Sequence, residues 1–225
     1  MLGLSNNLAS GGFVDTFANL KSISLDGSDE YLKIGDVFDI DLSGTNNYTV
    51  SAWVKIASGD SGLICSKRDG SNDGFEIGIH SGYVSWYLND GSTAIADTAD
   101  GTTVDDSVWH HIALVFKSGD KAYRYVDGVS TGTNDDVSSI NDCSNSDNFF
   151  IGSRDKTSPD NFITGSMKNI SIWNRALTAT EIQNVMYKTY YEVSGRLASG
   201  LVSWWALDAT GLGSDLVVNG GFDSG

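Results

Sequence analysis

The stretch YTVSAWVKI, residues 48–56, decides the fold class of this chain. Every second residue from Val50 to Ile56 is apolar, so an extended backbone places these side chains on one face and the more polar ones on the other. The later stretch WHHIALVFK, residues 109–117, also alternates, but both of its faces are largely apolar. That pattern indicates a strand covered on both sides, which is typical of the centre of a sheet.

Short alternating runs continue outward from these two strands, from residue 22 to residue 173. Asp-Gly and Ser-Gly pairs separate the runs and supply the left-handed backbone conformations that hairpins require. Only four of the 29 acidic residues are Glu, which favours turns over helices. The pattern predicts an all-β fold of two stacked antiparallel sheets. The predicted strands are 22–25, 31–34, 48–56, 62–66, 75–80, 83–88, 93–97, 109–117, 121–126, 148–152 and 165–173.

One segment has the pattern of a helix. Thr178 and Glu181 have the spacing of a capping box, and apolar residues follow at helical spacing from Ile182 to Met186. We therefore expect one short helix near residues 179–188, with its apolar stripe packed on the rim of a sheet.

Six motifs follow one another along the chain: SISLDGSDEYLKIG (22–35), YTVSAWVKI (48–56), VWHHIALVF (108–116), YVDGV (125–129), FFIGSR (149–154) and GSMKNISIWNRALTATEI (165–182). In this order they resemble the concanavalin A-like, laminin-G-like (LamG, pentraxin-like) jelly-roll domain family, of the kind found in phage and bacterial structural or adhesin proteins. The resemblance implies a two-sheet jelly-roll sandwich.

The resemblance also suggests how the chain is organised. We expect an N-terminal arm at 1–20, the LamG-like sandwich at 21–192, and a linker, an extra strand and a tail at 193–225. The segment GLVSWWALDATG, residues 200–211, either completes this sandwich in permuted order or begins a second module.

Charge and composition argue against several classes of protein. The net charge is −15 and no basic patch interrupts it, so nucleic-acid binding is not expected. No apolar run is long enough to insert into a membrane, and the first residues lack the basic and apolar parts of a secretory signal peptide. Cys65 and Cys143 have no metal-binding spacing, and two independent buried thiols are favoured over a disulfide.

An enzyme is not expected, and no catalytic residue is named. Glycosidases of the resembling family carry a Glu-x-Asp-x-x-Glu strand, whereas Glu76 is followed by Gly78 and Ser81 at the corresponding spacings. His110 and His111 are adjacent on a strand and so point to opposite faces, which favours structural roles over a catalytic base.

Calcium is the one cofactor that the resemblance implies. In pentraxin-like relatives the ion lies between two loops that correspond here to residues 67–73 and 154–161. Calcium prefers oxygen ligands, which both loops contain. The candidate ligands are Asp69, Asn72, Asp73, Asp155 and Asp160. Because Lys67, Arg68, Arg154 and Lys156 lie in the same loops, ordinary solvated turns with surface ion pairs are the alternative.

A sugar site would use exposed aromatic rings that stack on sugar faces. The candidate ligand-binding residues are Trp53, Tyr83, Trp86 and Tyr87. Three of them lie on one strand whose side chains alternate, so at least one ring is expected to be exposed. Packing in the core or on the sheet surface is the alternative for each ring.

These observations favour a non-catalytic, lectin-like structural or adhesion module. We expect it to be part of a virion, as a head fibre, decoration or tail adhesin, where it forms a homo-oligomer, assembles with other virion or surface proteins and attaches to cell-surface glycans. The alternative is a calcium-dependent carbohydrate-binding domain of an exported bacterial protein, located extracellularly or at the cell surface. A concanavalin-like glycoside hydrolase is the third hypothesis.

Overall fold

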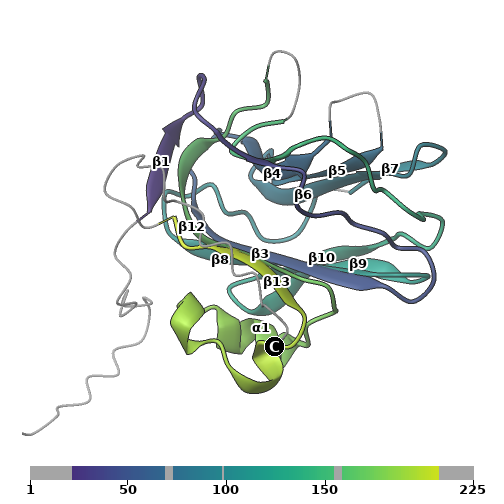
Figure 1. The fold of residues 1–225 in the computed structure, drawn as a ribbon. Coiled ribbons are helices and arrows are strands. Elements are labelled where there is room, and N and C mark those ends of the chain that lie inside the picture. The colour runs from purple at the N-terminus through teal and green to yellow at the C-terminus, as the bar shows by residue number, and fades with distance from the viewer. Residues whose placement is uncertain (1–21, 69–72, 98, 155–158, 208–225) are drawn as a thin grey trace, which may run out of the picture.

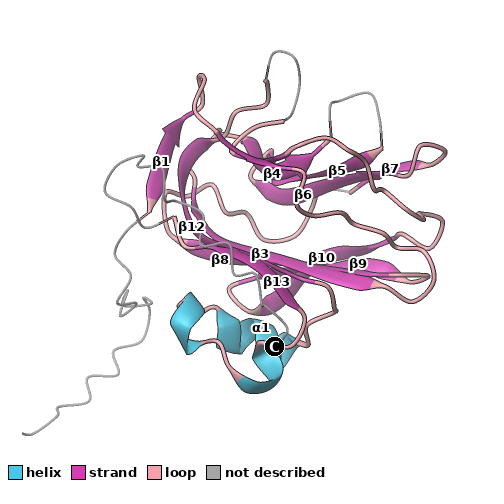
Figure 2. Ribbon diagram, in the orientation of Figure 1, coloured by secondary structure: helices cyan, strands magenta, loops and turns pink. Residues whose placement is uncertain are grey.

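The computed structural model describes residues 22–68, 73–97, 99–154 and 159–207 and shows two antiparallel sheets stacked face to face (Figures 1 and 2). The predicted two-sheet all-β sandwich is therefore confirmed. The predicted arm at 1–20 and the residues after Leu207 lie outside the described residues.

One sheet has seven strands and the other has six. The seven-stranded sheet runs in the order β1 (Ile23–Asp26), β12 (Thr164–Trp173), β3 (Asn47–Lys55), β8 (His110–Lys117), β9 (Lys121–Val126) and β10 (Val129–Asp136), and β13 (Leu201–Trp205) also pairs with β12. The six-stranded sheet runs in the order β2 (Leu32–Gly35), β11 (Phe149–Ile151), β4 (Gly62–Lys67), β5 (Gly74–His80), β6 (Tyr83–Asn89) and β7 (Ala94–Ala96). Each predicted strand overlaps an observed strand.

The core between the sheets explains the alternation around residue 50. Val54 of β3 and both Leu114 and Phe116 of β8 are buried in this core. Ala113 and Val115 of β8 point the other way, into a second apolar cluster on the outer side of the same sheet. Because β8 is buried on both faces and pairs with β3 and β9, its prediction as a central strand is confirmed.

The helix α1 (Ala179–Val185) begins at the predicted capping box. The Thr178 hydroxyl accepts a hydrogen bond from the Glu181 backbone N–H over 3.2 Å, and the Glu181 carboxylate accepts one from the Thr178 backbone N–H over 2.9 Å. The helix is seven residues long, and no helix in the described ranges has both the length and the apolar character to span a membrane.

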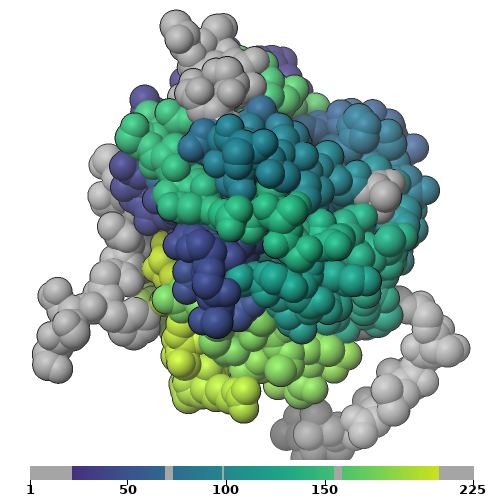
Figure 3. All heavy atoms as spheres, turned by 90° about the vertical axis from the view of Figure 1, so that its right-hand side faces the viewer, coloured from purple at the N-terminus to yellow at the C-terminus, as the bar shows by residue number. Residues whose placement is uncertain are grey.

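The predicted position of this helix, at the rim of a sheet, is wrong. α1 lies on the outer face of the seven-stranded sheet, and the light-green helical segment forms the bottom of the molecule in Figure 3. Ile182 and Val185 pack there with Ala113, Val115 and Trp173. A sheet face with such small and apolar side chains removes more of the helix surface from water than a rim contact would.

β10 is the strand that the sequence analysis missed. Its sequence is VSTGTNDD, and its side chains are exposed or only half buried. It is an edge strand that pairs with β9, so it has no core face to produce an alternating pattern. The Asp100 carboxylate covers its outer edge and accepts hydrogen bonds from the Thr133 backbone N–H (2.9 Å) and hydroxyl (2.6 Å).

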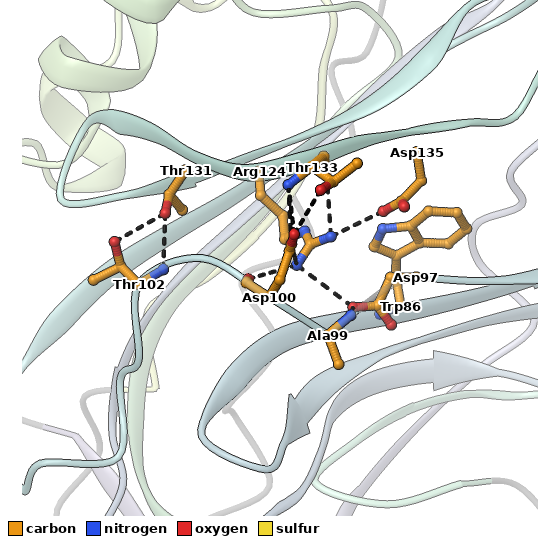
Figure 4. A network of polar contacts seen from close by, with 9 residues as sticks. All are labelled: Trp86, Asp97, Ala99, Asp100, Thr102, Arg124, Thr131, Thr133 and Asp135. Atoms are coloured by element: carbon orange, nitrogen blue, oxygen red, sulfur yellow. Dashed lines mark hydrogen bonds and ion pairs between the residues drawn. The ribbon is translucent and has the colours of Figure 1, made fainter.

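A buried arginine joins the two sheets at this edge (Figure 4). Arg124 of β9 is 1% exposed and contacts Asp135 of β10 over 2.9 Å, Asp100 over 3.1 Å and Asp97 over 3.6 Å. Asp97 follows β7 of the six-stranded sheet, so these ion pairs bridge the sandwich. Three carboxylates share one guanidinium group, and burial raises the pKa of Asp97.

The segment after residue 193 is part of the same sandwich as far as the structure describes it. Two short 3-10 helices lie near the predicted boundary at 193: Tyr190–Glu192 is at the end of the predicted sandwich, and Gly195–Leu197 is in the predicted linker. β13 then pairs antiparallel with β12. Of the two alternatives for residues 200–211, this pairing agrees with the one in which the segment adds a strand to the sandwich, and residues 208–211 lie outside the described residues.

Candidate functional site

The outer face of the six-stranded sheet carries a row of side chains that runs across four neighbouring strands. Backbone pairing aligns Phe150 of β11 with Ser66 of β4, Ser66 with Glu76 of β5, and Glu76 with Tyr87 of β6. Because side chains alternate along a strand, Gly78 on β5 shares this outer face with Glu76. The row therefore lies on the face opposite the sandwich core, where Glu76 and Tyr87 are half buried while Ser66 and Phe150 are covered by other side chains.

A pocket on this face is lined by Leu63 and Ser85, the two strand partners of Gly78, and we call it the Gly78 pocket. It is an open cavity of about 240 Å³. Its polar and aromatic side chains come from β5, β6 and two loops. The lining residues are Ser61, Gly62, Leu63, Glu76, Ile79, His80, Ser85, Asn161 and Phe162.

Two glycines allow the backbone segments beside the pocket to approach one another closely. A Cβ atom at Gly78 would lie 2.4 Å from the Gly62 carbonyl oxygen. A Cβ atom at Gly62 would lie 2.5 Å from the Phe162 carbonyl oxygen, and Gly62 has a φ of +137°, where glycine is favoured. The loop that carries Phe162 therefore lies directly against β4, where the Leu63 backbone N–H donates to the Asn161 carbonyl over 3.0 Å.

Two arginines hold the Glu76 carboxylate in place. Glu76 Oε1 lies 2.7 Å from Arg68 Nη1 and 3.0 Å from Arg154 Nη1. Arg154 also binds Asp160 through two parallel hydrogen bonds of 2.8 Å. The Asp160 and Glu76 carboxylates together raise the pKa of the Arg154 guanidinium. The result is a rigid, charge-balanced frame around the Glu76 carboxylate, which lines the pocket.

The predicted calcium ligands are only partly placed. Asp69, Asn72 and Asp155 lie outside the described residues. The Asp160 carboxylate is bound by Arg154, and the Asp73 carbonyl accepts a hydrogen bond from the Asn145 side chain over 2.8 Å. Within the described ranges there is no group of three or more His, Cys, Asp or Glu residues that could hold a metal ion. Calcium binding therefore stays a prediction.

Two of the four predicted ligand-binding aromatic residues lie away from the pocket. Trp86 is 3% exposed and its ring packs edge-on against Phe116 in the core, so the prediction that its ring binds a sugar is wrong. The alternation on β6 turns Trp86 inward. Trp53 lies on the seven-stranded sheet, where its indole N–H donates to the Met186 carbonyl over 3.0 Å and its ring meets His111 edge-on.

The other two predicted ligand-binding residues, Tyr83 and Tyr87, lie on the pocket side of the six-stranded sheet. Tyr83 and Tyr87 are half buried and flank Ser85 on β6. The Arg68 guanidinium covers the Tyr87 ring at 4.2 Å from its centroid, so that face is occupied by a protein contact. Neither tyrosine is among the residues that line the pocket.

The sequence analysis missed the residues that line the pocket. The alternation along residues 75–80 could have placed Glu76, Gly78 and His80 on one face. No local signal identifies Asn161 and Phe162, because their loop reaches β4 only through the fold of the whole chain.

The two adjacent histidines of β8 have different surroundings. His110 lies between two carboxylates, with Nδ1 at 2.8 Å from Asp127 and Nε2 at 3.1 Å from Asp106, and the Asp127 contact raises its pKa. His111 is 2% exposed, and burial lowers its pKa to about 4.

Both cysteines are free and buried. Burial raises the pKa of Cys65 and of Cys143 to about 12, so neither thiol is a reactive thiolate at neutral pH.

Comparison with known proteins identifies the superfamily to which this fold corresponds. The sequence profile of the Concanavalin A-like lectin/glucanases superfamily matches residues 26–183. A heptameric SAP-like pentraxin from Limulus polyphemus has a TM-score of 0.56 and 19% identity, with 84% of this chain and 92% of the pentraxin covered. A candidate carbohydrate binding protein from Bacteroides ovatus has a TM-score of 0.56 and 19% identity, with 85% of this chain and 53% of that protein covered.

Domains LG4-5 of the mouse laminin alpha1 chain have a TM-score of 0.51 and 15% identity, with 71% of this chain and 44% of that structure covered. The chain spans about half the length of several of the structures that it matches. No curated protein matches it in sequence.

Proposed function

The chain belongs to the Concanavalin A-like lectin/glucanases superfamily, and from that premise we propose that it is a lectin-like, non-catalytic binding module that holds an uncharged glycan in the Gly78 pocket. The observation that carries the proposal is the pocket lining, which combines hydrogen-bonding groups with an aromatic wall. The Bacteroides ovatus protein of similar fold, described as carbohydrate binding, agrees with this proposal.

The pocket chemistry suits sugar hydroxyls. Ser61, Ser85 and Asn161 can donate and accept hydrogen bonds, and Glu76 accepts them. Phe162 offers an apolar surface to the C–H face of a sugar ring. At about 240 Å³ the cavity is smaller than the roughly 300–1,000 Å³ of typical drug-sized sites, so it suits a single sugar ring.

Charge favours a neutral ligand over an acidic one. Among the described residues, Glu76 is the only Asp, Glu, Lys or Arg that lines the pocket, and the chain carries a net charge of −15. A uronate or sialate carboxylate would face this carboxylate, and the described lining residues include no Lys or Arg that could bind it. Uncharged hexoses avoid that repulsion.

The same residues argue against a glycosidase. Most glycosidases use two carboxyl groups that flank the bond, and Glu76 carries the only carboxylate among the lining residues that the structure describes. Both Arg68 and Arg154 contact its Oε1 atom, so this carboxylate is already engaged in two ion pairs. Binding without turnover is the simpler function for this arrangement.

The setting of the module is the second part of the proposal. We place it in a virion or another surface structure, where it forms a homo-oligomer and attaches the particle to cell-surface glycans. The motif order that resembles phage and bacterial adhesin domains supports this setting. Purification of the full chain from its native source tests it, since copurification with a particle is expected and a free monomer would contradict it.

A calcium-dependent carbohydrate-binding domain of an exported bacterial protein is the alternative. It differs in one measurable respect, because its sugar binding would disappear when EDTA removes calcium. In our proposal the Glu76 carboxylate is held by arginines, so binding at the Gly78 pocket persists in EDTA.

A glycan array of neutral and acidic glycans tests the main proposal. We expect the wild-type chain to bind neutral glycans and Glu76→Gln to lose most of that binding, because the variant removes the charged acceptor and keeps the side-chain shape. Glu192→Gln, on the 3-10 helix at 190–192, is the matched control and should bind as the wild type does. Binding to no glycan, or equal binding by Glu76→Gln, would refute the proposal.

A further inference from the structure

Next to the Gly78 pocket lies an aromatic surface that the pocket itself does not use. Tyr31, just before β2, stacks on Phe150 of β11 with ring centroids 5.2 Å apart and an interplanar angle of 23°. The Tyr31 ring also lies 6.1 Å from the Phe162 ring, at 36°. Phe162 lines the pocket, so the three rings connect the pocket wall to the adjacent sheet surface.

Tyr31 is the accessible member of this group. It is 39% exposed, whereas Phe150 beneath it is 2% exposed. The other largely exposed aromatic side chains of the described residues are Tyr187 and Tyr191, which lie in the helical segment on the far side of the seven-stranded sheet. Tyr31 is therefore the exposed aromatic ring beside the pocket, held at a fixed tilt by its stacking on Phe150.

We propose that Tyr31 forms a second sugar subsite and that the ligand is a neutral oligosaccharide, with one unit in the Gly78 pocket and a neighbouring unit stacked on the Tyr31 ring. This inference rests on the proposed function and deepens it. The cavity holds about one ring, so a longer glycan must leave it across the sheet surface. The Phe162 wall directs one such path toward Tyr31.

The stacking on Phe150 makes this subsite rigid before the ligand arrives. A preorganised aromatic ring loses little conformational freedom on binding, so more of the stacking energy appears as affinity. Lys33 lies on the same surface, with its Nζ 5.8 Å from the Phe150 ring centroid. Its ammonium group can donate hydrogen bonds to hydroxyl groups of the second sugar unit.

Calorimetric titration with matched short and long sugars tests the subsite. The probes are glucose with cellotetraose, mannose with mannotetraose, and galactose with galactotetraose. For at least one pair we expect the tetrasaccharide to bind the wild-type chain roughly 3- to 10-fold more tightly than the monosaccharide, which is the range of an aromatic contact.

The variants separate the two subsites. Tyr31→Leu keeps Phe150 covered but removes the aromatic face, and it should bind the tetrasaccharide no more tightly than the monosaccharide. Tyr31→Phe should restore the difference. Tyr191→Leu, at a tyrosine that is 88% exposed, is the matched control and should retain it. A melting curve for each variant shows that it is folded.

The possible failures are distinguishable. If the monosaccharide binds and Glu76→Gln abolishes its binding, but Tyr31→Leu leaves the tetrasaccharide affinity unchanged, the subsite is refuted and the proposed function stands. Equal wild-type affinities for the monosaccharide and the tetrasaccharide would refute the subsite as well. If neither member of any pair binds, both the proposed function and the subsite are refuted.

Discussion

Arg154 binds Asp160 through two parallel hydrogen bonds, Nε to Oδ1 and Nη2 to Oδ2, each 2.8 Å long. The same guanidinium contacts Glu76 over 3.0 Å, so one side chain joins the loop that ends at Phe162 to the centre of the six-stranded sheet. The position of the pocket wall therefore depends on an ion pair, and not only on apolar packing.

Arg154→Gln should lower the free energy of unfolding by about 1–2 kcal/mol, between the values for exposed pairs and for fully buried ones. We expect a value in the lower part of that range, because the Asp160 side chain is 38% exposed and water screens its charge. Urea denaturation of Arg154→Gln, Asp160→Asn and the double variant measures the pair energy. Additive effects of the two single changes would show that the pair contributes nothing.

Gly78→Ala should abolish sugar binding and destabilise the fold by about 1–3 kcal/mol, as overpacking does. The new methyl group would meet the Gly62 carbonyl oxygen at 2.4 Å and the Leu63 side chain at 3.0 Å, and would displace these two lining residues. Thermal melting and sugar titration measure the two effects. Ser85→Ala, which removes a lining hydroxyl without a clash, serves as the comparison and should keep wild-type stability. Retention of wild-type binding by Gly78→Ala would mean that the ligand does not contact this part of the pocket.

His111 should make the protein less stable in acid. Its pKa is about 4 when folded and near 6.5 when unfolded, so between these values the unfolded chain binds a proton that the folded chain does not. The stability that it contributes is present above pH 6.5 and is lost as the pH falls toward 4, on the order of 3 kcal/mol in total. Denaturant titrations from pH 7 to pH 4 should show a shallower decline for His111→Phe than for the wild type. His80→Phe, an exposed control, should follow the wild type.

His110 should have the opposite pH dependence. The carboxylates of Asp127 and Asp106 raise its folded pKa above the unfolded value, so the folded chain holds the proton more tightly. The resulting stability is fully present below pH 6.5 and is lost as the pH rises through the folded pKa. His110→Gln should remove this loss, and equal slopes for variant and wild type above pH 6.5 would contradict the assignment.

Arg124→Leu should destabilise the sandwich by about 3–5 kcal/mol at pH 7, because it leaves the buried Asp97 carboxylate without its ion pair to Arg124. Burial already raises the folded pKa of Asp97, and loss of the guanidinium group should raise it further, so the folded state takes up a proton as the pH falls. The deficit relative to wild type should therefore shrink between pH 7 and pH 5. Arg196→Leu, at an 82% exposed side chain, is the control and should change stability by less than about 1 kcal/mol. A deficit that does not depend on pH would point to lost packing instead of uncompensated charge.

The strands illustrate which features a local pattern can predict. β3 and β8 were predicted because each has at least one face in the core. The residues on that face are apolar, so apolar residues recur at every second position of the sequence. β10 was missed because an edge strand without a core face has no such pattern. Trp86 was correctly placed on a strand, but the alternation alone did not say which of the two faces of β6 was buried.

The capping box shows the same limit for the helix. Thr178 and Glu181 determine where α1 begins, because the hydrogen bonds that start a helix join residues three positions apart. The face on which the helix packs was predicted wrongly, since it depends on Ala113 and Val115, more than 60 residues earlier in the chain.

Alternation, turn residues and capping act between neighbours in the chain, so the sequence by itself determined the fold class, nearly all of the strands and the start of the helix. The Gly78 pocket was decided only by the tertiary structure. Gly62, Gly78 and Phe162 come together through strand pairing and a loop contact. A Cβ atom at Gly62 would meet the Phe162 carbonyl oxygen, and a Cβ atom at Gly78 would meet the Gly62 carbonyl oxygen, so this close approach requires glycine at both positions. Such steric complementarity belongs to the packed chain and leaves no periodic trace in the sequence.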